Sequence, residues 1–228
     1  MKKLKTMNEK VKAEYNKVAD DYDAKASGHD IPLEAESLYK SDLLEMLGET
    51  SKRTLEIGVG TGRFAALLDA WGFEVTGIDF SPEMLKHAKE NLPHLDLRLV
   101  DDAETMPDDF FSPASFDLIV CRQVSCHFLD PIATFAKWKN WLAPSGRVVI
   151  IEGLWSRFDW AGDWQNFVDV SPLTCTQTWA TFTYLLKQAG YENARGEWLN
   201  KVNGFEAVRA FSTNAEPMLR FAVIAQSS

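Results

Sequence analysis

The fold of this chain is decided by the stretch Leu55-Glu56-Ile57-Gly58-Val59-Gly60-Thr61-Gly62-Arg63. A short apolar run over residues 53–58 is typical of a buried strand, and helical periodicity resumes over residues 64–71. Glycine accepts positive φ and lets the backbone approach a ligand closely. In an open parallel sheet, ligands bind at the turn between the carboxyl end of a strand and the next helix. The stretch therefore predicts a strand, a ligand-binding turn and a helix.

The spacing of the glycines distinguishes two kinds of nucleotide site. A dinucleotide-binding turn has the pattern Gly-x-Gly-x-x-Gly, which would place its third glycine at position 63. Position 63 is Arg, and the third glycine is Gly62. The pattern is therefore Gly-x-Gly-x-Gly, with the carboxyl group of Glu56 two residues before the first glycine.

Two further carboxylates follow the next two predicted strands. Asp79 lies 21 residues after Gly58, and a carboxylate at that place accepts hydrogen bonds from ribose hydroxyls. The other interpretation of Asp79 is a cap, shared with Ser81, for the helix that follows. Asp102 comes after the third strand, at the same edge of the sheet, where its carboxylate would face an adenine amine.

Strands and helices alternate along most of the chain. We expect helices over residues 8–27, 33–47, 64–71, 82–91, 131–142 and 178–189, and strands over residues 53–58, 73–78, 95–100, 116–121, 147–152, 191–199 and 218–225. The alternation predicts βαβ units and a parallel sheet covered on both faces. A turn over residues 144–146 is expected to open the strand 147–152. The last two strands have no evident helical crossover, which favours an antiparallel edge.

Composition narrows the class of protein. The 228 residues include 24 Lys and Arg against 33 Asp and Glu, a net charge of −9. This balance argues against a nucleic-acid partner, because phosphates attract a basic surface. Three cysteines are too few for a disulfide framework and favour a cytoplasmic protein. We expect no metal site, and no membrane partner, since the apolar run Val148–Ile151 ends at Glu152.

Taken together, these motifs resemble those of the class I S-adenosylmethionine-dependent methyltransferases that act on small molecules. The segments that match successive motifs of this family are residues 55–62, 78–85, 101–107, 116–121 and 142–149. In addition, Tyr15-Asn-Lys-Val-Ala-Asp-Asp-Tyr22-Asp23 resembles a helix that often caps the cofactor in small-molecule members.

The resemblance implies an α/β fold of the Rossmann-like, doubly wound kind. Its sheet would have seven mostly parallel strands, an antiparallel last strand and an N-terminal helical cap. We expect one methyltransferase domain over residues 1–228. Residues 1–50 would form the helical cap, 51–152 the cofactor-binding core, and 153–228 the acceptor lid and C-terminal strands.

The resemblance also implies which residues bind S-adenosylmethionine and its product S-adenosylhomocysteine. The expected contacts are Tyr15, Tyr22, Glu56, Gly58, Gly60, Gly62, Arg63, Asp79, Phe80, Met84, Asp102, Ala103 and Arg122. The glycines would make room for the methionine part of the cofactor, which Glu56 and Arg63 would orient. Phe80 and Met84 would flank the adenine, although core packing is the other interpretation of these two side chains.

The acceptor is expected to bind beneath residues 153–179, which hold four of the eight tryptophans of the chain. An aromatic lid with a few polar groups suits a planar or cationic acceptor. The expected acceptor contacts are Tyr22, His127, Trp155, Trp160 and Trp164. His127 is the candidate base, with Arg122 as a second catalytic candidate; the other interpretation of His127 is a structural hydrogen bond.

The predicted function is transfer of a methyl group from S-adenosylmethionine to a small-molecule acceptor. The nucleophile would be an oxygen or a nitrogen on a planar, aromatic or heterocyclic compound, and the protein would act as a monomer or homodimer. One alternative is a regulatory protein that binds the cofactor without turnover, and another is a protein or tRNA methyltransferase. The intact glycine turn and the aromatic lid count against the first alternative, and the net charge counts against the second.

Overall fold

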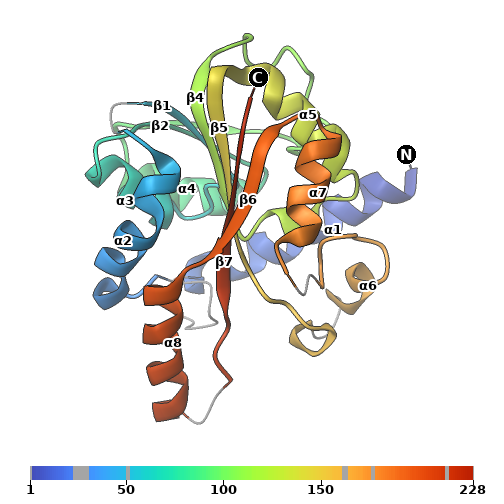
Figure 1. The fold of residues 1–228 in the computed structure, drawn as a ribbon. Helices are drawn as coiled ribbons and strands as arrows, with labels where there is room; N and C mark the ends of the chain where they lie inside the picture. Colours follow the sequence, from blue (N-terminus) through green and yellow to red (C-terminus); the bar gives the residue numbers. More distant parts are fainter. Residues whose placement is uncertain are drawn as a thin grey trace.

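The computed structural model describes residues 2–22, 31–49, 52–160, 164–175, 178–213 and 216–227. In this part of the chain, seven strands form one sheet in the order β3-β2-β1-β4-β5-β7-β6 (Figure 1). The strands are β1 (Arg53–Ile57), β2 (Glu74–Asp79), β3 (Asp96–Leu99), β4 (Phe116–Arg122), β5 (Leu142–Gly153), β6 (Glu192–Trp198) and β7 (Arg220–Gln226). β7 pairs antiparallel with both β5 and β6, and the other neighbours pair in parallel. The predicted Rossmann-like sheet with its antiparallel last strand is confirmed.

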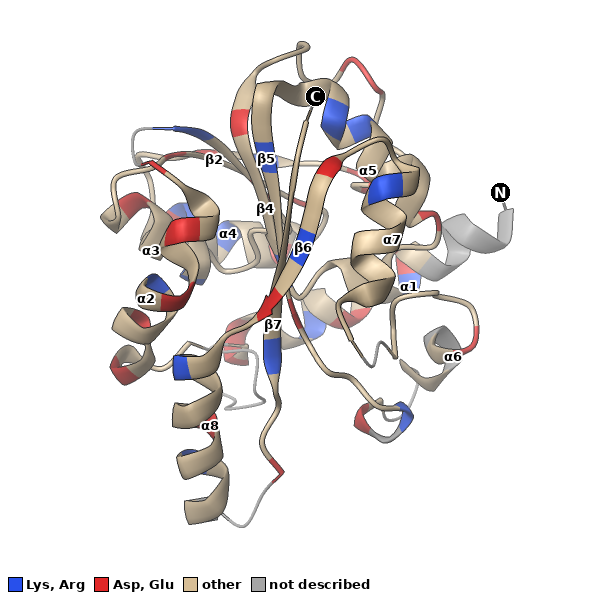
Figure 2. Cartoon of the chain, viewed as in Figure 1, with Lys and Arg blue, Asp and Glu red and all other residues tan. Residues whose placement is uncertain are grey.

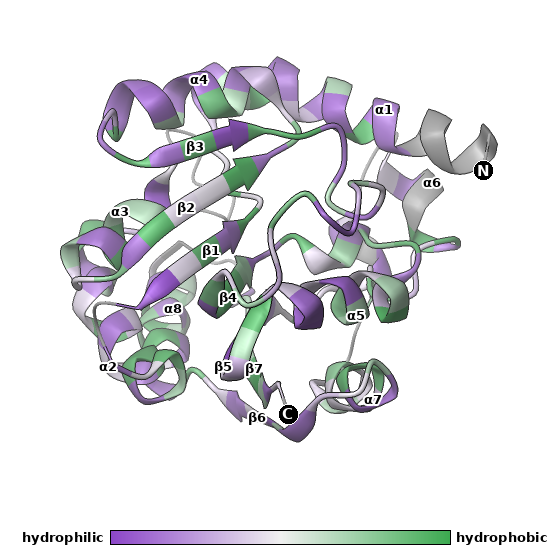
Figure 3. Cartoon of the chain, turned by 90° about the horizontal axis from the view of Figure 1, so that it is seen from above, coloured by the Kyte–Doolittle hydropathy of each residue, from purple (hydrophilic) through white to green (hydrophobic). Residues whose placement is uncertain are grey.

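Helices cover both faces of the sheet (Figure 3). They are α1 (Lys2–Val18), α2 (Glu36–Leu47), α3 (Arg63–Ala70), α4 (Pro82–Asn91), α5 (Pro131–Trp141), α6 (Gln165–Val168), α7 (Ala180–Gln188) and α8 (Asn200–Thr213). Short 3-10 turns are η1 (Ala19–Asp21), η2 (Leu33–Ala35), η3 (Ser125–His127) and η4 (Arg157–Asp159). Buried side chains of α2, α3 and α4 form one core layer, and those of α5 and α7 form the opposite layer.

Local sequence signals start the two helices that frame the site. The Ser81 hydroxyl accepts a hydrogen bond from the Met84 N–H and caps α4, and the Asp130 carboxylate caps α5 in the same way. In both helices, Pro occupies the first position, where its missing N–H leaves no intrahelical bond unmade. Two residues connect β2 to α4, and the connection from β4 to α5 contains η3 and the cap Asp130.

The structure differs from the predicted elements at three places. Helix α1 begins at Lys2 rather than residue 8 and continues as a 3-10 turn to Asp21, while predicted positions 23–27 lie outside the described residues. The turn predicted at residues 144–146 lies inside β5 as a bulge, with Ser145 at φ +62°, because β4 has too few residues to pair with all of β5. Helix α8, which the sequence did not predict, connects β6 to β7.

Charged side chains are distributed over several elements. Figure 2 shows Lys and Arg interspersed with Asp and Glu on the helices and strands in view. Among the described helices, none combines the length and apolar character that crossing a membrane requires. Within the same residues, no group of three His, Cys, Asp or Glu side chains is arranged to hold a metal ion.

Candidate functional site

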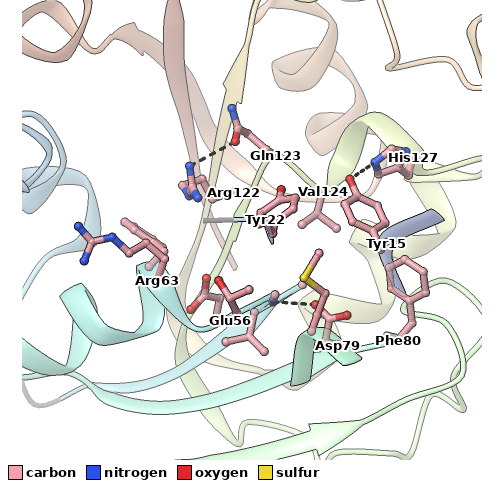
Figure 4. Close-up of a pocket in the computed structure, with 16 residues that line it drawn as sticks. Tyr15, Tyr22, Glu56, Arg63, Asp79, Phe80, Arg122, Gln123, Val124 and His127 are labelled. Atoms are coloured by element: carbon pink, nitrogen blue, oxygen red, sulfur yellow. Dashed lines mark hydrogen bonds between the residues drawn. The ribbon is translucent and has the colours of Figure 1, made fainter. Parts of the chain in front are cut away.

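A pocket of about 680 Å³ lies at the carboxyl ends of β1, β2 and β4 (Figure 4). Its lining residues are Tyr15, Tyr22, Glu56, Gly58, Val59, Gly60, Thr61, Arg63, Phe64, Asp79, Phe80, Met84, Arg122, Gln123, Val124 and His127. Strand ends, the glycine turn and helix α1 therefore meet at one place. Val59, Thr61, Phe64, Gln123 and Val124 were not predicted, although the first three lie within or beside the glycine turn.

The glycines of the turn serve different purposes. Gly58 and Gly60 have φ of +72° and +56°, which disfavours any residue with a Cβ. A Cβ on Gly58 would lie 2.3 Å from a methyl carbon of Val124, whereas a Cβ on Gly60 would have no neighbour within 4 Å. Gly62, expected with them at the cofactor, immediately precedes α3, and a Cβ there would crowd Leu92 and Ala88. It permits α3 to pack closely on α4.

Asp79 ties the glycine turn to the start of α4. Its Oδ2 accepts a hydrogen bond from the Gly60 N–H at 2.7 Å, and its Oδ1 accepts one from the Ser81 N–H at 2.8 Å. Burial raises the pKa of Asp79 to about 6, against the opposing effect of these backbone donors. Ser81 alone provides the helix cap, so the carboxylate of Asp79 is directed at the turn. Each of its oxygens retains a lone pair for a further donor.

Glu56 has an unusual environment for a carboxyl group. The residue is 2% exposed, and its Oε2 has no hydrogen-bond partner among the described residues. Burial raises the pKa of Glu56 to about 8, while the charge of Arg122 opposes that rise. A buried carboxyl group without a partner is costly, because nothing replaces the water it has lost. The arrangement favours a cationic ligand group beside Glu56.

Arg63 connects the pocket to the N-terminal helical region. Its guanidinium donates to the Ile31 carbonyl at 3.2 and 2.7 Å and to Glu36 Oε1 at 2.7 Å. Because Glu36 begins α2, this bond fixes the wall of the pocket formed by Arg63 to the entrance of that helix. The predicted role of Arg63 in orienting the methionine part of the cofactor stays a prediction.

Helix α1 lies across the pocket and is joined to the loops around it by hydrogen bonds of three side chains. The Tyr15 hydroxyl and His127 Nε2 are 2.9 Å apart, and the Ser81 hydroxyl donates to Asn16 Oδ1 at 2.6 Å. Asn8 Nδ2 donates to Asp102 Oδ2. Asn8, Asp102 and Ala103 line a smaller pocket of about 410 Å³ beyond Phe80. Of the other residues predicted for adenine, Phe80 lines both this pocket and the first, and Met84 lines only the first, so their role at adenine stays a prediction.

A third pocket, of about 920 Å³, adjoins the first and shares Tyr15, Tyr22, Gln123 and His127 with it. The tryptophans Trp155, Trp160 and Trp164, which the sequence assigned to the acceptor, line this pocket. Trp179, the fourth tryptophan of the lid segment, instead packs on Trp198 at 4.8 Å between ring centroids. We call this third cavity the aromatic pocket.

A buried carboxyl group that the sequence did not identify supports the aromatic pocket. Glu152, at the end of β5, accepts hydrogen bonds from the Ser125 hydroxyl at 2.5 Å and from Trp155 Nε1 at 3.3 Å. Burial raises the pKa of Glu152, although both donors oppose the rise. The hydroxyls of Ser171 and Thr174 both donate to the Cys126 carbonyl, which holds the segment 171–174 against η3, next to Ser125. The sequence signal was a single acid at the end of an apolar strand.

Comparison with known proteins identifies the fold and the family. A family described as "Methyltransferase domain" matches residues 33–195. The Xanthomonas euvesicatoria protein "Ubiquinone biosynthesis O-methyltransferase" is 31% identical over 116 residues, which cover 49% of this chain and 46% of that protein. The match thus spans about half the length of the curated relative.

Two solved structures share the fold at low sequence identity. One is Haemonchus contortus phosphoethanolamine N-methyltransferase 2 with phosphomonomethylethanolamine and S-adenosylhomocysteine (TM-score 0.59, 19% identity, covering 86% of this chain and 57% of that one). The other is the cyclase SpnF (TM-score 0.69, 15% identity, covering 96% of each chain). At these identities the likeness concerns the arrangement of the sheet and helices.

Proposed function

This chain belongs to the methyltransferase-domain family, and from that premise we propose that it transfers a methyl group from S-adenosylmethionine to a small-molecule acceptor. The observation that carries the proposal is the buried Glu56 beside the glycine turn, whose Oε2 has no hydrogen-bond partner among the described residues. The amino-acid part of the cofactor bears an ammonium group, the partner that such a carboxyl group requires. The aromatic pocket adjoins the cofactor pocket and would hold an acceptor.

The residues present fit the cofactor from end to end. Glu56 would hold the ammonium group, and Arg122 the carboxylate of the same end. Asp79 would accept the ribose hydroxyls with the lone pairs that its two backbone donors leave. Phe80, Met84, Asp102 and Ala103 would surround the adenine, and Gly60 leaves open the space that a side chain would fill.

The chain contributes mainly orientation. When bound, S-adenosylmethionine supplies a methyl group that is already electrophilic. Tyr15, Tyr22, Gln123 and His127 stand at the boundary of the two pockets, where they would align the nucleophile and exclude water. The nucleophile of the acceptor would be an oxygen or a nitrogen, and the tryptophans provide apolar walls for the group that carries it.

The fold alone does not decide the reaction, because a cyclase shares it. The test is therefore chemical. In titration calorimetry we expect S-adenosylmethionine and S-adenosylhomocysteine to bind with micromolar dissociation constants, about −8 kcal/mol, and NAD not to bind. Incubation with labelled cofactor and pooled metabolites, followed by mass spectrometry, should yield a labelled small molecule. Preference for NAD would overturn the cofactor assignment, and cofactor binding without any transfer to a metabolite pool would favour the regulatory alternative.

A further inference from the structure

The aromatic pocket is walled by rings that contact one another in sequence. Between ring centroids, Tyr15 lies 6.2 Å from Tyr22 and 5.6 Å from Trp164, and Trp164 lies 6.1 Å from Trp160. Trp160 in turn lies 5.4 Å from Trp155. Ring pairs here are tilted or edge-on, with angles of 48° to 70° between their planes. The rings thus face the cavity from several directions, unlike a slot between two parallel rings.

The polar groups around these rings are acidic. The pocket is lined by Glu14 and Asp159, and among its described lining residues there is no Lys or Arg. Glu152 lies directly behind Trp155, to whose Nε1 it is hydrogen-bonded. Arg157, within the lid segment, pairs with Asp169 through two hydrogen bonds of 2.6 and 3.1 Å. Glu14 pairs with Lys17 at 2.5 Å, so the net negative charge of the described lining comes from Asp159.

We infer that the acceptor is an aliphatic amine whose nitrogen becomes a quaternary or substituted ammonium among Tyr15, Tyr22 and Trp164. This inference rests on the proposed methyl transfer and specifies its substrate class. The nitrogen lone pair forms the new N–C bond, while the S–C bond of the cofactor breaks and its electron pair stays on sulfur. A tertiary amine gives a permanent cation, and a secondary amine releases its proton afterwards to solvent.

Charge development separates this acceptor from an oxygen nucleophile. Positive charge grows on an amine nitrogen during transfer, and the faces of Tyr and Trp rings attract such charge. The carboxylate of Asp159, which is exposed, adds a modest attraction that salt screens. A phenolate or carboxylate acceptor would instead bring negative charge next to Asp159, without a Lys or Arg in the described lining to offset it.

The decisive comparison uses a cation and its uncharged twin on the protein saturated with S-adenosylhomocysteine. Choline carries a trimethylammonium group, and 3,3-dimethylbutan-1-ol replaces its nitrogen by carbon at nearly the same shape. Followed by tryptophan fluorescence, choline should bind about tenfold or more tightly than the carbon isostere, because the two ligands differ only in charge. Equal affinities would overturn the inference.

Substitutions of Trp164 and Asp159 test whether these two residues cause the preference for choline over its carbon isostere. Trp164→Leu should abolish most of the preference for choline, whereas Trp164→Phe, which retains a ring, should keep most of it. Asp159→Asn should weaken choline about two- to fivefold at low salt and leave the isostere unchanged, because Asp159 is exposed and screened. The matched control is Glu90→Gln, which removes one exposed acid on α4 outside the pocket lining and should change neither affinity.

A transfer experiment completes the test. With labelled cofactor, a mixture of secondary and tertiary aliphatic amines should acquire label, and a parallel mixture of phenols and carboxylic acids should not. Label in the phenols alone would overturn the amine assignment while leaving methyl transfer intact. If S-adenosylhomocysteine fails to bind in the first place, the proposed function itself fails, so the two failures have different signatures.

Discussion

The Tyr15 hydroxyl and His127 Nε2 lie 2.9 Å apart and join helix α1 to the loop after β4, at the boundary between the cofactor pocket and the aromatic pocket. Burial raises the pKa of the Tyr15 phenol well above its usual value, so the hydroxyl keeps its proton near neutral pH. If that proton is donated, the Nε2 lone pair is occupied; if Nε2 donates, it has no lone pair to offer. In either arrangement, Nε2 is not free to act as a base while the bond persists.

Cofactor binding should release a proton near pH 7. The pKa of Glu56, about 8 in the cofactor-free protein, leaves its carboxyl group about 0.9 protonated at that pH. An ammonium group beside it stabilises the charged form and lowers the pKa, so the proton leaves. Calorimetry in buffers of different ionisation enthalpy measures the number released. We expect 0.5 to 1 proton, as an order of magnitude, for each cofactor bound at pH 7, and none above about pH 9.

The Glu56→Gln variant should bind the cofactor more weakly and release no proton. The glutamine amide has nearly the same shape as the glutamate carboxyl group, but it has no charge to titrate. Proton release that persists in this variant would mean that another group, such as Asp79, accounts for it.

Glu56 also makes the stability of the cofactor-free protein depend on pH. Its folded pKa lies above that of an unfolded glutamic acid, so between about pH 4.5 and pH 8 the native state holds a proton that the unfolded state has lost. Stability should therefore fall as pH rises, by up to about 1.4 kcal/mol for each pH unit. Denaturant unfolding at pH 6, 7 and 8 measures this slope, and Glu56→Gln should flatten it. Equal slopes in the two proteins would contradict the buried, protonated state.

Asp79 and Ser81 separate ligand binding from helix capping. Asp79→Ala should weaken cofactor binding by about 1.5–3 kcal/mol, because charge-assisted hydrogen bonds to the ribose are lost. Ser81→Ala removes the cap of α4 and the hydrogen bond to Asn16 of α1, so it should lower the free energy of unfolding by about 1 kcal/mol and weaken cofactor binding less than Asp79→Ala does. Calorimetry and denaturant unfolding on both variants distinguish the two effects. An unchanged dissociation constant in a folded Asp79→Ala protein would mean that the carboxylate only holds the glycine turn.

Two alanine substitutions in the glycine turn should affect different properties: Gly58→Ala mainly the stability of the fold, and Gly60→Ala mainly cofactor binding. Gly58→Ala places a methyl group 2.3 Å from Val124 at φ +72°, and should cost about 2–4 kcal/mol of stability. Gly60→Ala meets no neighbour within 4 Å, and should cost only about 1 kcal/mol of backbone strain. Because its methyl group occupies space at the cofactor pocket, it should weaken cofactor binding about tenfold or more. Thermal unfolding and calorimetry report the two quantities separately.

The parts of the site that the sequence predicted are those set by neighbouring residues. The glycine turn follows β1 directly, Asp79 ends β2 and Asp102 lies three residues after β3, and parallel strands bring their carboxyl ends to one edge of the sheet. Ser81 and Asp130 cap helices that begin one residue later, so these boundaries agree with the structure. Such signals lie within a few residues of the feature they predict.

The parts that were missed depend on residues distant in the chain. Asp42 accepts hydrogen bonds from the N–H groups of Lys201 and Val202 and so caps α8, an element without a local start signal. Ser125 and Trp155 are the partners that make Glu152 part of the site. The packing of α3 on α4 likewise decides the place of Gly62. Motif spacing in the sequence does not predict these contacts, because the partners lie far apart in the chain.

The bond between Tyr15 and His127 leads to the last prediction, which concerns the role of His127. If the bond serves to position the two pockets, His127→Ala and Tyr15→Phe remove the same interaction. Each should lower turnover by about tenfold and leave cofactor affinity nearly intact, and the double variant should lose little more than either single variant.

A base at His127 would behave differently in three measurements. Turnover of His127→Ala would fall by roughly 10²–10⁴-fold, the double variant would follow His127→Ala rather than Tyr15→Phe, and the acidic limb of the pH–rate profile would vanish. We expect the limb to remain, because an amine acceptor must itself lose a proton before it attacks, whichever residue stands at position 127. The profiles of wild type and His127→Ala, recorded with one acceptor, therefore decide between a base and a positioning residue. Loss of the limb in the alanine variant alone would show that His127 carries the proton and that its bond to Tyr15 opens during turnover.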